Sequence, residues 1–181
     1  MARIKLEELR QEILKYIGIP YHTNRPKKNF ADNSLIGKGS AKEIALKTIE
    51  IANKENIKLI DLTAKQIYNL QKKNGIGIDC SGLVCHLLNF YFQSKLNPRR
   101  TSADMLTSTP LSTEIESSEV TTADLVRQKN GHHVLFVIEK IGDKIIYVDS
   151  SIKGRGVHFG EFDLNDKKFK TQGFFRLFLL N

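Results

Sequence analysis

The spacing of apolar residues changes once along the chain, and that change restricts the folds available to it. Up to Phe92, apolar side chains recur at three- and four-residue steps, which is typical of amphipathic helices. From Asp124 onward they stand in short runs rich in Val, Ile, Leu and Phe, with turn residues such as Gly142-Asp143 between them. Helices therefore come first and an antiparallel β-meander follows, which predicts an α+β fold with segregated elements.

Capping and breaking residues give approximate element boundaries. Gly18 and Pro20 end the first helix, Ser40 and Thr63 are good N-caps for the second and third, and residues 20–39 have the composition of a loop. A Ser/Thr-rich connection joins the two halves. We expect helices over 6–17, 41–51, 64–74, 80–92 and 101–106. We expect strands over 125–126, 133–139, 144–149, 156–159 and 174–179.

The length of 181 residues suits one domain with a substantial core. No apolar run approaches the roughly 18 residues of a membrane-spanning helix, and the N-terminal segment lacks the apolar region of a signal peptide. We therefore expect no membrane span, and the localisation stays open between the cytoplasm and export by a non-standard route. The formal charge of +8 attracts polyanions, but no stretch interleaves basic with exposed aromatic residues, so no nucleic-acid partner is expected. We also expect a monomer.

Cys80 is the candidate nucleophile, because it follows a glycine-bearing loop and opens an apolar helix at an exposed start. A thiolate is favoured at a helix N-terminus, where unpaired N–H groups can receive an oxyanion. Asp79 is the expected N-cap, and Gly82 would let a substrate approach closely. Cys85 lies on a different face, so no disulfide is expected. A zinc site of Cys80, Cys85 and His86 is a rival hypothesis, but its spacing matches no usual pattern, and we expect neither metal nor cofactor.

The base for this thiol must come from another part of the chain. His22 lies in the predicted loop and His86 lies one and a half turns along the nucleophile's helix, so both are poor candidates. His132 and His133 open the first long strand. Strand residues alternate between the two faces of a sheet, so only one of this pair can point at Cys80.

A third residue is needed to orient the imidazole. Asp149, at the end of the next hairpin strand, can lie beside His133 across the ladder. We expect Leu135, Val137 and Asp149 to share the face of the sheet that packs against the nucleophile's helix. His158 lies late in the meander and is assigned no role from the sequence.

Three segments carry a resemblance to a known family. Asp79–Val84 has the sequence Asp-Cys-Ser-Gly-Leu-Val, which resembles the nucleophile motif of the NlpC-type cell-wall cysteine peptidases, a papain-like family. Ala123–Val126 is similar to that family's Pro-Gly-Asp-Leu strand ahead of the histidine, and His133–Val137 is similar to its His-Val-Gly-Ile-Tyr strand. In this register the base is His133, because a valine follows it directly.

The resemblance implies a papain-like fold, with N-terminal helices and the nucleophile at a helix N-terminus that packs on an antiparallel β-meander. It covers roughly residues 75–180. Residues 22–74 then form a helical insertion within a single domain of residues 1–181. The chain has no tryptophan and no recognisable wall-binding module.

The chain departs from the family at two functional positions. Many members carry a second histidine where this chain has Asp149, and in this respect the chain is similar to the related CHAP amidases. The family's Pro-Tyr dipeptide is kept as Pro20-Tyr21, but it lies far upstream of the nucleophile. Tyr68 has the family's spacing, but it lies in a predicted helix with no proline before it. Tyr21 is the candidate for lining the substrate pocket, and Tyr68 is the alternative.

The resemblance implies a cysteine hydrolase that cleaves amide bonds in peptidoglycan stem peptides, as a γ-D-glutamyl-diamino acid endopeptidase. Cys80, His133 and Asp149 would be catalytic, and Asp79 and Ser81 would help to hold the free amine of the substrate. Two alternatives stay open. One is an amidase, deamidase or acyltransferase that acts on another amide substrate, and the other is a catalytically idle binding module.

Overall fold

In the computed structural model, residues 5–23, 31–166, 169 and 171–178 are described. These residues form five α-helices and one six-stranded antiparallel sheet, so the fold is α+β, as the periodicity predicts. The helices are α1 (Leu6–Leu14), α2 (Ala41–Lys54), α3 (Ala64–Lys73), α4 (Cys80–Phe92) and α5 (Ala103–Leu106). The strands are β1 (Ser112–Ile115), β2 (Leu125–Gln128), β3 (His133–Ile141), β4 (Lys144–Ser151), β5 (Gly156–Asp163) and β6 (Phe174–Leu177).

The sheet has the order β1-β6-β2-β3-β4-β5, and each pairing is antiparallel. Strands β2 to β5 form the predicted meander. The prediction is wrong at the other edge, because β6 lies between β1 and β2 instead of beside β5. Strand β1 lies in the segment expected to be a Ser/Thr-rich connection. Its sequence, Ser-Thr-Glu-Ile, is mostly polar and sits at a sheet edge, so no apolar run marks it.

The second and third helices begin where their N-caps predict. Ser40 and Thr63 each form a capping box, in which the side chain accepts a hydrogen bond from the N3 backbone and the N3 side chain accepts one from the N-cap backbone. The first helix is shorter than expected, because α1 ends at Leu14 rather than near Ile17, and the chain turns before Gly18. Leu14 and Ile17 are both exposed, whereas Tyr16 between them is buried in the main core.

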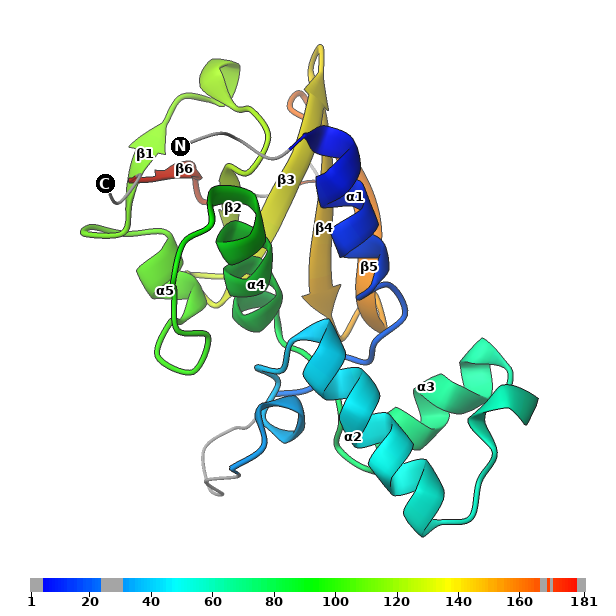
Figure 1. Cartoon of the computed structure of the whole chain (residues 1–181). Helices are drawn as coiled ribbons and strands as arrows, with labels where there is room; N and C mark the ends of the chain where they lie inside the picture. Colours follow the sequence, from blue (N-terminus) through cyan, green and yellow to red (C-terminus); the bar gives the residue numbers. More distant parts are fainter. Residues whose placement is uncertain (1–4, 24–30, 167–168, 170, 179–181) are drawn as a thin grey trace.

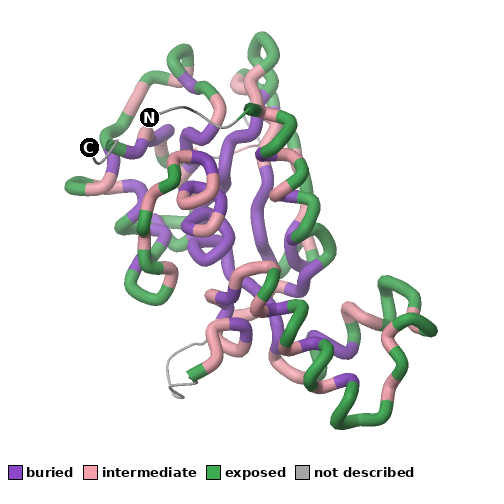
Figure 2. Tube along the Cα trace, viewed as in Figure 1, coloured by how far each residue is buried: buried purple, intermediate pink, exposed green. Residues whose placement is uncertain are grey.

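Helix α4 lies on one face of the sheet, with α1 beside it (Figure 1). Its side chains share one core with β3 and β4: Leu83 and Leu87 belong to the same buried cluster as Phe136 and Val148. Full burial of a side chain of this kind contributes roughly 1.5–3 kcal/mol relative to exposure. The tube coloured by burial shows α4 and the strands behind it as the most buried part of the molecule (Figure 2). This core fixes the start of α4 against the sheet.

The face of the sheet that packs against α4 is not the expected one. Leu135 and Val137 belong to a second core cluster, whereas Phe136 packs with the side chains of α4. Asp149 lines the same hollow as Leu135, away from α4. The prediction that these residues face the nucleophile's helix is therefore wrong. Alternation fixes which residues share a face of a sheet, but not which face a helix covers.

Helices α2 and α3 lie beyond one end of the sheet, away from the main core (Figure 1). Much of their surface is exposed (Figure 2), and the exposed side chains include the apolar Leu46 and Ile60. The segment before α2 does contact the body of the domain, because Gly37 and Lys38 each form a β-bridge with Ile78. This contact brings part of the predicted insertion next to the start of α4.

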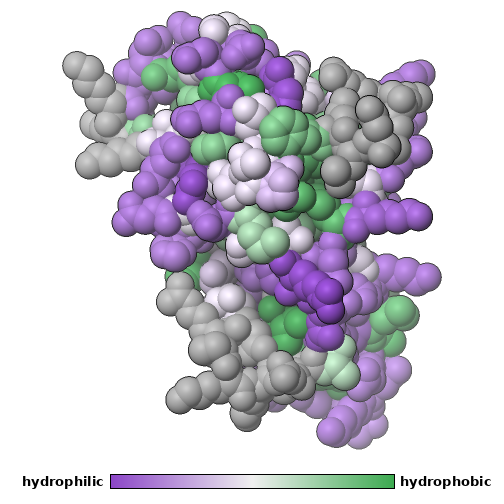
Figure 3. All heavy atoms as spheres, turned by 90° about the vertical axis from the view of Figure 1, so that its left-hand side faces the viewer, coloured by the Kyte–Doolittle hydropathy of each residue, from purple (hydrophilic) through white to green (hydrophobic). Residues whose placement is uncertain are grey.

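The side of the molecule that carries β1 and α5 presents a mixed surface. Hydrophobic side chains form small groups there, interspersed with hydrophilic ones (Figure 3). Across the described part of the chain, no helix combines the length and the apolar character that crossing a membrane requires.

Candidate active site

Cys80 is the first residue of α4, and its neighbours fix the start of that helix. The Asp79 side chain accepts a hydrogen bond from the Gly82 N–H at 2.7 Å, which is the N-cap that the sequence predicts. Gly82 has a different role from the expected one. A Cβ at this position would lie 2.4 Å from the carbonyl oxygen of Gly37, so the glycine admits the backbone of the segment before α2.

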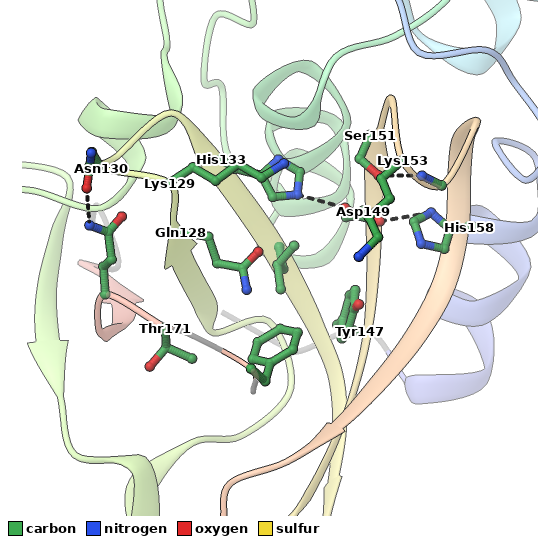
Figure 4. Close-up of a pocket in the computed structure, with 14 residues that line it drawn as sticks. Gln128, Lys129, Asn130, His133, Tyr147, Asp149, Ser151, Lys153, His158 and Thr171 are labelled. Atoms are coloured by element: carbon green, nitrogen blue, oxygen red, sulfur yellow. Dashed lines mark hydrogen bonds and ion pairs between the residues drawn. The ribbon is translucent and has the colours of Figure 1, made fainter. Parts of the chain in front are cut away.

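His133 begins β3, and its ring contacts both Cys80 and Asp149. Its Nε2 lies 2.7 Å from Oδ2 of Asp149 (Figure 4), which leaves Nδ1 as the ring nitrogen available to the sulfur. Burial by itself lowers the pKa of His133, but the hydrogen bond with Asp149, together with the hydrogen bond and charge of Cys80, raises it to about 9. The arrangement therefore favours an imidazolium at neutral pH, with the Cys80 and Asp149 side chains as its partners.

The neighbouring His132 is placed differently. Its side chain is exposed, while its carbonyl oxygen lies 3.9 Å from Sγ of Cys80. Only one ring of the adjacent pair is therefore a partner of the thiol. Alternation along β3 is not the reason, because His132 lies in the turn before the strand and His133 is its first residue. Cys80 itself is more buried than expected for an exposed helix start, at 6% exposure, and it reaches solvent through a hollow described below.

Asp149 is buried between two histidines. Its Oδ2 is bonded to His133, and its Oδ1 lies 2.9 Å from Nδ1 of His158 (Figure 4), the residue directly opposite in the β4–β5 ladder. This second contact lacks the angles of a hydrogen bond, and Oδ1 has no hydrogen-bond partner among the described residues. Nδ1 of His158 also lies 3.3 Å from the Gly156 carbonyl oxygen. Nδ1 of His158 therefore lies near two oxygen atoms, one from the Asp149 carboxylate and one from the Gly156 carbonyl.

Sequence reasoning missed the contact of His158 with Asp149, although a signal for it exists. The turn between β4 and β5 is centred between Lys153 and Gly154. Counting equal steps outward from that centre places His158 opposite Asp149. Residues directly opposite in an antiparallel pair share a face, so His158 belongs to the group that surrounds the carboxylate.

Asp79 and Ser81 are joined by a lysine that the sequence did not single out. Nζ of Lys38 lies 2.9 Å from Oδ1 of Asp79 and 2.6 Å from Oγ of Ser81. The Ser81 hydroxyl donates to the same Asp79 oxygen at 3.1 Å. Lys38 precedes α2 and lies within the predicted insertion, 41 residues before Asp79. No local pattern connects segments so far apart in sequence.

Two hollows lie at the candidate site, one beside Cys80 and one beside His133 and Asp149. One, of about 350 Å³, is lined by Cys80, the residues on either side of it, and Tyr21. The other, of about 800 Å³, is lined by His133, Asp149 and other residues of the opposite sheet face (Figure 4). Acyl transfer takes place at the sulfur, so the smaller hollow is the candidate substrate site even though the other is larger.

The other candidates from the sequence are placed as follows. Tyr21 forms a β-bridge with Ile78 and lines the hollow at the thiol, whereas Tyr68 lies on α3 and is not among the described residues that line it. His86 donates from Nε2 to a backbone carbonyl at 3.0 Å. Burial raises the pKa of Cys85 to about 12. No group of three or more His, Cys, Asp or Glu side chains in the described ranges could hold a metal ion.

No protein-family model matches the chain, and no curated protein matches its sequence. The function is therefore inferred from the site itself. Its central feature is a thiol at a helix start that is hydrogen-bonded with a buried imidazole, and Nε2 of this imidazole is bonded to a carboxylate. Such an arrangement can perform nucleophilic attack by sulfur with proton transfer by the imidazole.

Proposed function

We propose that this chain is a papain-like cysteine hydrolase related to the NlpC-type peptidases. Cys80 is the nucleophile, His133 is the acid and base, and Asp149 orients the imidazole. The observation that carries the proposal is the placement of the His133 ring, which bonds Asp149 through Nε2 and has a side-chain hydrogen bond with Cys80. A pKa raised by two specific partners next to a hollow is characteristic of functional sites.

The reaction would proceed in two steps. The Cys80 thiolate attacks the carbonyl carbon of an amide, and N–H groups of the first turn of α4 receive the oxyanion. His133 gives its proton to the leaving amine as the C–N bond breaks, which leaves a thioester on the sulfur. A water molecule then attacks the thioester, His133 takes a proton from it, and the C–S bond breaks to release a carboxylic acid.

The proposed substrates are peptidoglycan stem peptides, cleaved at an amide bond of the γ-D-glutamyl-diamino acid type. The Asp-Cys-Ser-Gly-Leu-Val segment at the start of α4 supports this substrate class through its resemblance to the NlpC-type motif. Tyr21 supports it as well. This tyrosine belongs to the Pro-Tyr dipeptide, and it lines the hollow at Cys80 although it lies far upstream in the sequence.

A different amide substrate is the second candidate, processed by the same chemistry as an amidase, deamidase or acyltransferase. Two observations favour it. Asp149, rather than a second histidine, is the partner of the imidazole, as in the CHAP amidases. Lys38 also bonds both Asp79 and Ser81, the residues expected to hold a free amine.

The test is incubation of the purified protein with defined muropeptides and with glutamine-containing peptides, followed by mass spectrometry. Stem-peptide hydrolysis is expected to give two fragments whose masses sum to the substrate plus one water, and deamidation a single product of nearly unchanged mass. Cys80→Ala, in the same preparation, is expected to give neither. Absence of any product or acyl-enzyme with the unaltered protein would contradict the proposal.

A further inference from the structure

The hollow at Cys80 has an unusual charge arrangement, because both of its carboxylates are paired within the chain. Asp79 and Asp104 are the acidic residues among those that line it. Asp79 forms an ion pair with Lys38, which comes from the segment before α2. Asp104, on α5, forms an ion pair with Arg127 of β2. Of the two, Asp79 is the more buried, at 11% side-chain exposure against 65% for Asp104, so the pairing with Lys38 is the less accessible to solvent.

Lys38 is fixed in place rather than loosely tethered at the surface. Its side chain is 14% exposed, and its ammonium group contacts both Asp79 and Ser81. Its backbone is held as well, because its N–H donates to Asn33 and its carbonyl accepts a hydrogen bond from His86. A partly buried side chain with this many partners has little freedom to move aside for a ligand.

Hydrogen-bond donors within the chain already occupy Oδ1 of Asp79 and the hydroxyl oxygen of Ser81. Oδ1 of Asp79 receives hydrogen bonds from Lys38, Ser81 and the Gly82 N–H. The Ser81 hydroxyl uses its one proton for Asp79 and accepts from Lys38. A second ammonium group bound here would lie close to that of Lys38 with little water between them, and like charges at short range repel strongly in such surroundings.

We propose that Lys38 is a specificity-determining residue that occupies the position of a substrate amine, so that the enzyme selects acyl groups whose neighbouring amine is blocked in an amide. The substrate class is then an internal or N-acylated peptide rather than one with a free amine beside the reacting residue. This inference rests on the proposed function, because it assumes that the acyl group is bound at Cys80.

Two peptidyl chloromethyl ketones, identical except that the amine of the residue before the reactive one is free or acetylated, provide the test. Each alkylates a reactive cysteine, and the rate of mass gain at Cys80 is followed by mass spectrometry with peptide mapping. The unaltered protein is expected to react roughly tenfold faster with the acetylated probe than with the free-amine probe. In Lys38→Gln the ratio of the two rates is expected to fall to about one or to reverse.

Two variants and one reagent separate specificity from structural damage. Lys38→Arg keeps a cation and is expected to keep the preference, as is Lys42→Met, which removes an exposed lysine of α2. Iodoacetamide, a small uncharged reagent, reports the reactivity of the thiol itself. A merely structural role for Lys38 would change the rates of both probes and of iodoacetamide together, and would leave the ratio unchanged.

The outcomes distinguish this inference from its premise. Equal rates for the two probes in the unaltered protein, or an unchanged ratio in Lys38→Gln, would overturn the role of Lys38 and leave Cys80 as the nucleophile. Failure of every reagent to label Cys80 would overturn the proposed function, and the inference with it. A tenfold preference for the acetylated probe that depends on a cation at position 38 would support both the role of Lys38 and the proposed function.

Discussion

Asp79 and Asp149 are both buried carboxylates beside the thiol–imidazole pair, yet their surroundings differ. One oxygen of Asp79 receives three hydrogen bonds, and the residue caps α4 and pairs with Lys38. Asp149 is bonded to His133 through one oxygen, while its other oxygen has no hydrogen-bond partner among the described residues. The first carboxylate joins two segments of the scaffold, whereas the second lies between the imidazoles of His133 and His158 and makes its hydrogen bond to His133.

Under the proposed function, this difference separates the residues that serve stability from those that serve catalysis. Removing a carboxylate with several donors leaves those donors unpaired, which costs folding free energy. Removing a carboxylate that is hydrogen-bonded to the His133 imidazole changes the charge and orientation of that ring. We therefore expect changes on the Asp79 side to appear mainly in stability and substrate preference, and changes on the Asp149 side to appear mainly in turnover.

The largest expected effect is that of Cys80→Ala. Turnover should fall by roughly 10⁴-fold or more, because no other thiol can replace the nucleophile. The thermal unfolding midpoint should change little, since the side chain is small. Iodoacetamide should label Cys80 well before Cys85, because burial raises the pKa of Cys85 to about 12 and keeps its sulfur protonated. Faster labelling of Cys85, or an active alanine variant, would remove Cys80 from the mechanism.

Substitutions of the adjacent histidines His132 and His133 should differ sharply in their effect on kcat. His133→Ala is expected to lower kcat by roughly 10³-fold, because it removes the proton donor and acceptor of both steps. His132→Ala serves as the matched control and should cost less than about tenfold, since its side chain is exposed. Steady-state kinetics on the two variants compare them directly. A larger loss in His132→Ala would show that the wrong ring has been assigned.

Asp149→Ala is expected to lower kcat by roughly 100-fold, which is less than the loss of either reacting group. A ring without its carboxylate partner is still present, but its tautomer and orientation are no longer fixed. Asp149→Asn should be milder, because an amide can still hold the ring. Kinetics that are unchanged in both variants would reduce the site to a Cys–His pair.

The pH dependence of both stability and turnover follows from the hydrogen bond between His133 and Asp149. The pKa of His133 in the folded protein, about 9, lies above the ordinary value of 6.5. The imidazolium therefore stabilises the fold fully below about pH 6.5, and this stabilisation is lost as the pH rises through about 9. Turnover should also fall as the pH rises through about 9, because the proton donor is lost. In Asp149→Asn this alkaline limb should move to lower pH, and a limb that does not move would contradict the assignment.

Asp79→Ala tests the scaffold side of the comparison. It removes the N-cap of α4 and leaves the ammonium of Lys38 without its carboxylate, so the free energy of unfolding should fall by about 2–4 kcal/mol. Urea denaturation provides the measurement, with Asp149→Ala as the matched buried carboxylate. If Asp149→Ala proves the more destabilising of the two, the division between scaffold and catalytic carboxylates is wrong.

Local patterns in the sequence predict much of this site. A cap residue followed by cysteine and an apolar run predicts the thiol at a helix start. One of the two adjacent histidines is the partner of the thiol, as expected, but not through alternation along a strand, because His132 lies in the turn before β3. The structure brings Cys80, His133 and Asp149 together. The face of the sheet that packs against α4 was predicted wrongly, because a strand pattern is the same whichever face a helix covers.

The features that the sequence did not predict arise mostly from contacts between segments that are distant in the sequence. The position of β6 beside β2 depends on a return across the sheet that no local pattern encodes. Lys38 lies beside Asp79 where Gly82 admits the carbonyl oxygen of Gly37, a close approach of two backbones that is visible only in three dimensions. The histidine opposite Asp149 was within reach of sequence reasoning, since the β4–β5 register follows from the turn.

The smallest expected effect is that of substituting His158, the histidine opposite Asp149. His158→Gln should lower kcat by about two- to fivefold without changing KM, because its Nδ1 lies 2.9 Å from Asp149 Oδ1 in a partly exposed position where such contacts are weak. The ring also packs over Gly154 in the β4–β5 turn, so a structural role is the competing explanation. A double-mutant cycle with Asp149→Asn separates the two. If His158 acts through the carboxylate, the loss should disappear in the Asp149→Asn background, whereas an equal loss in both backgrounds would assign it to the turn.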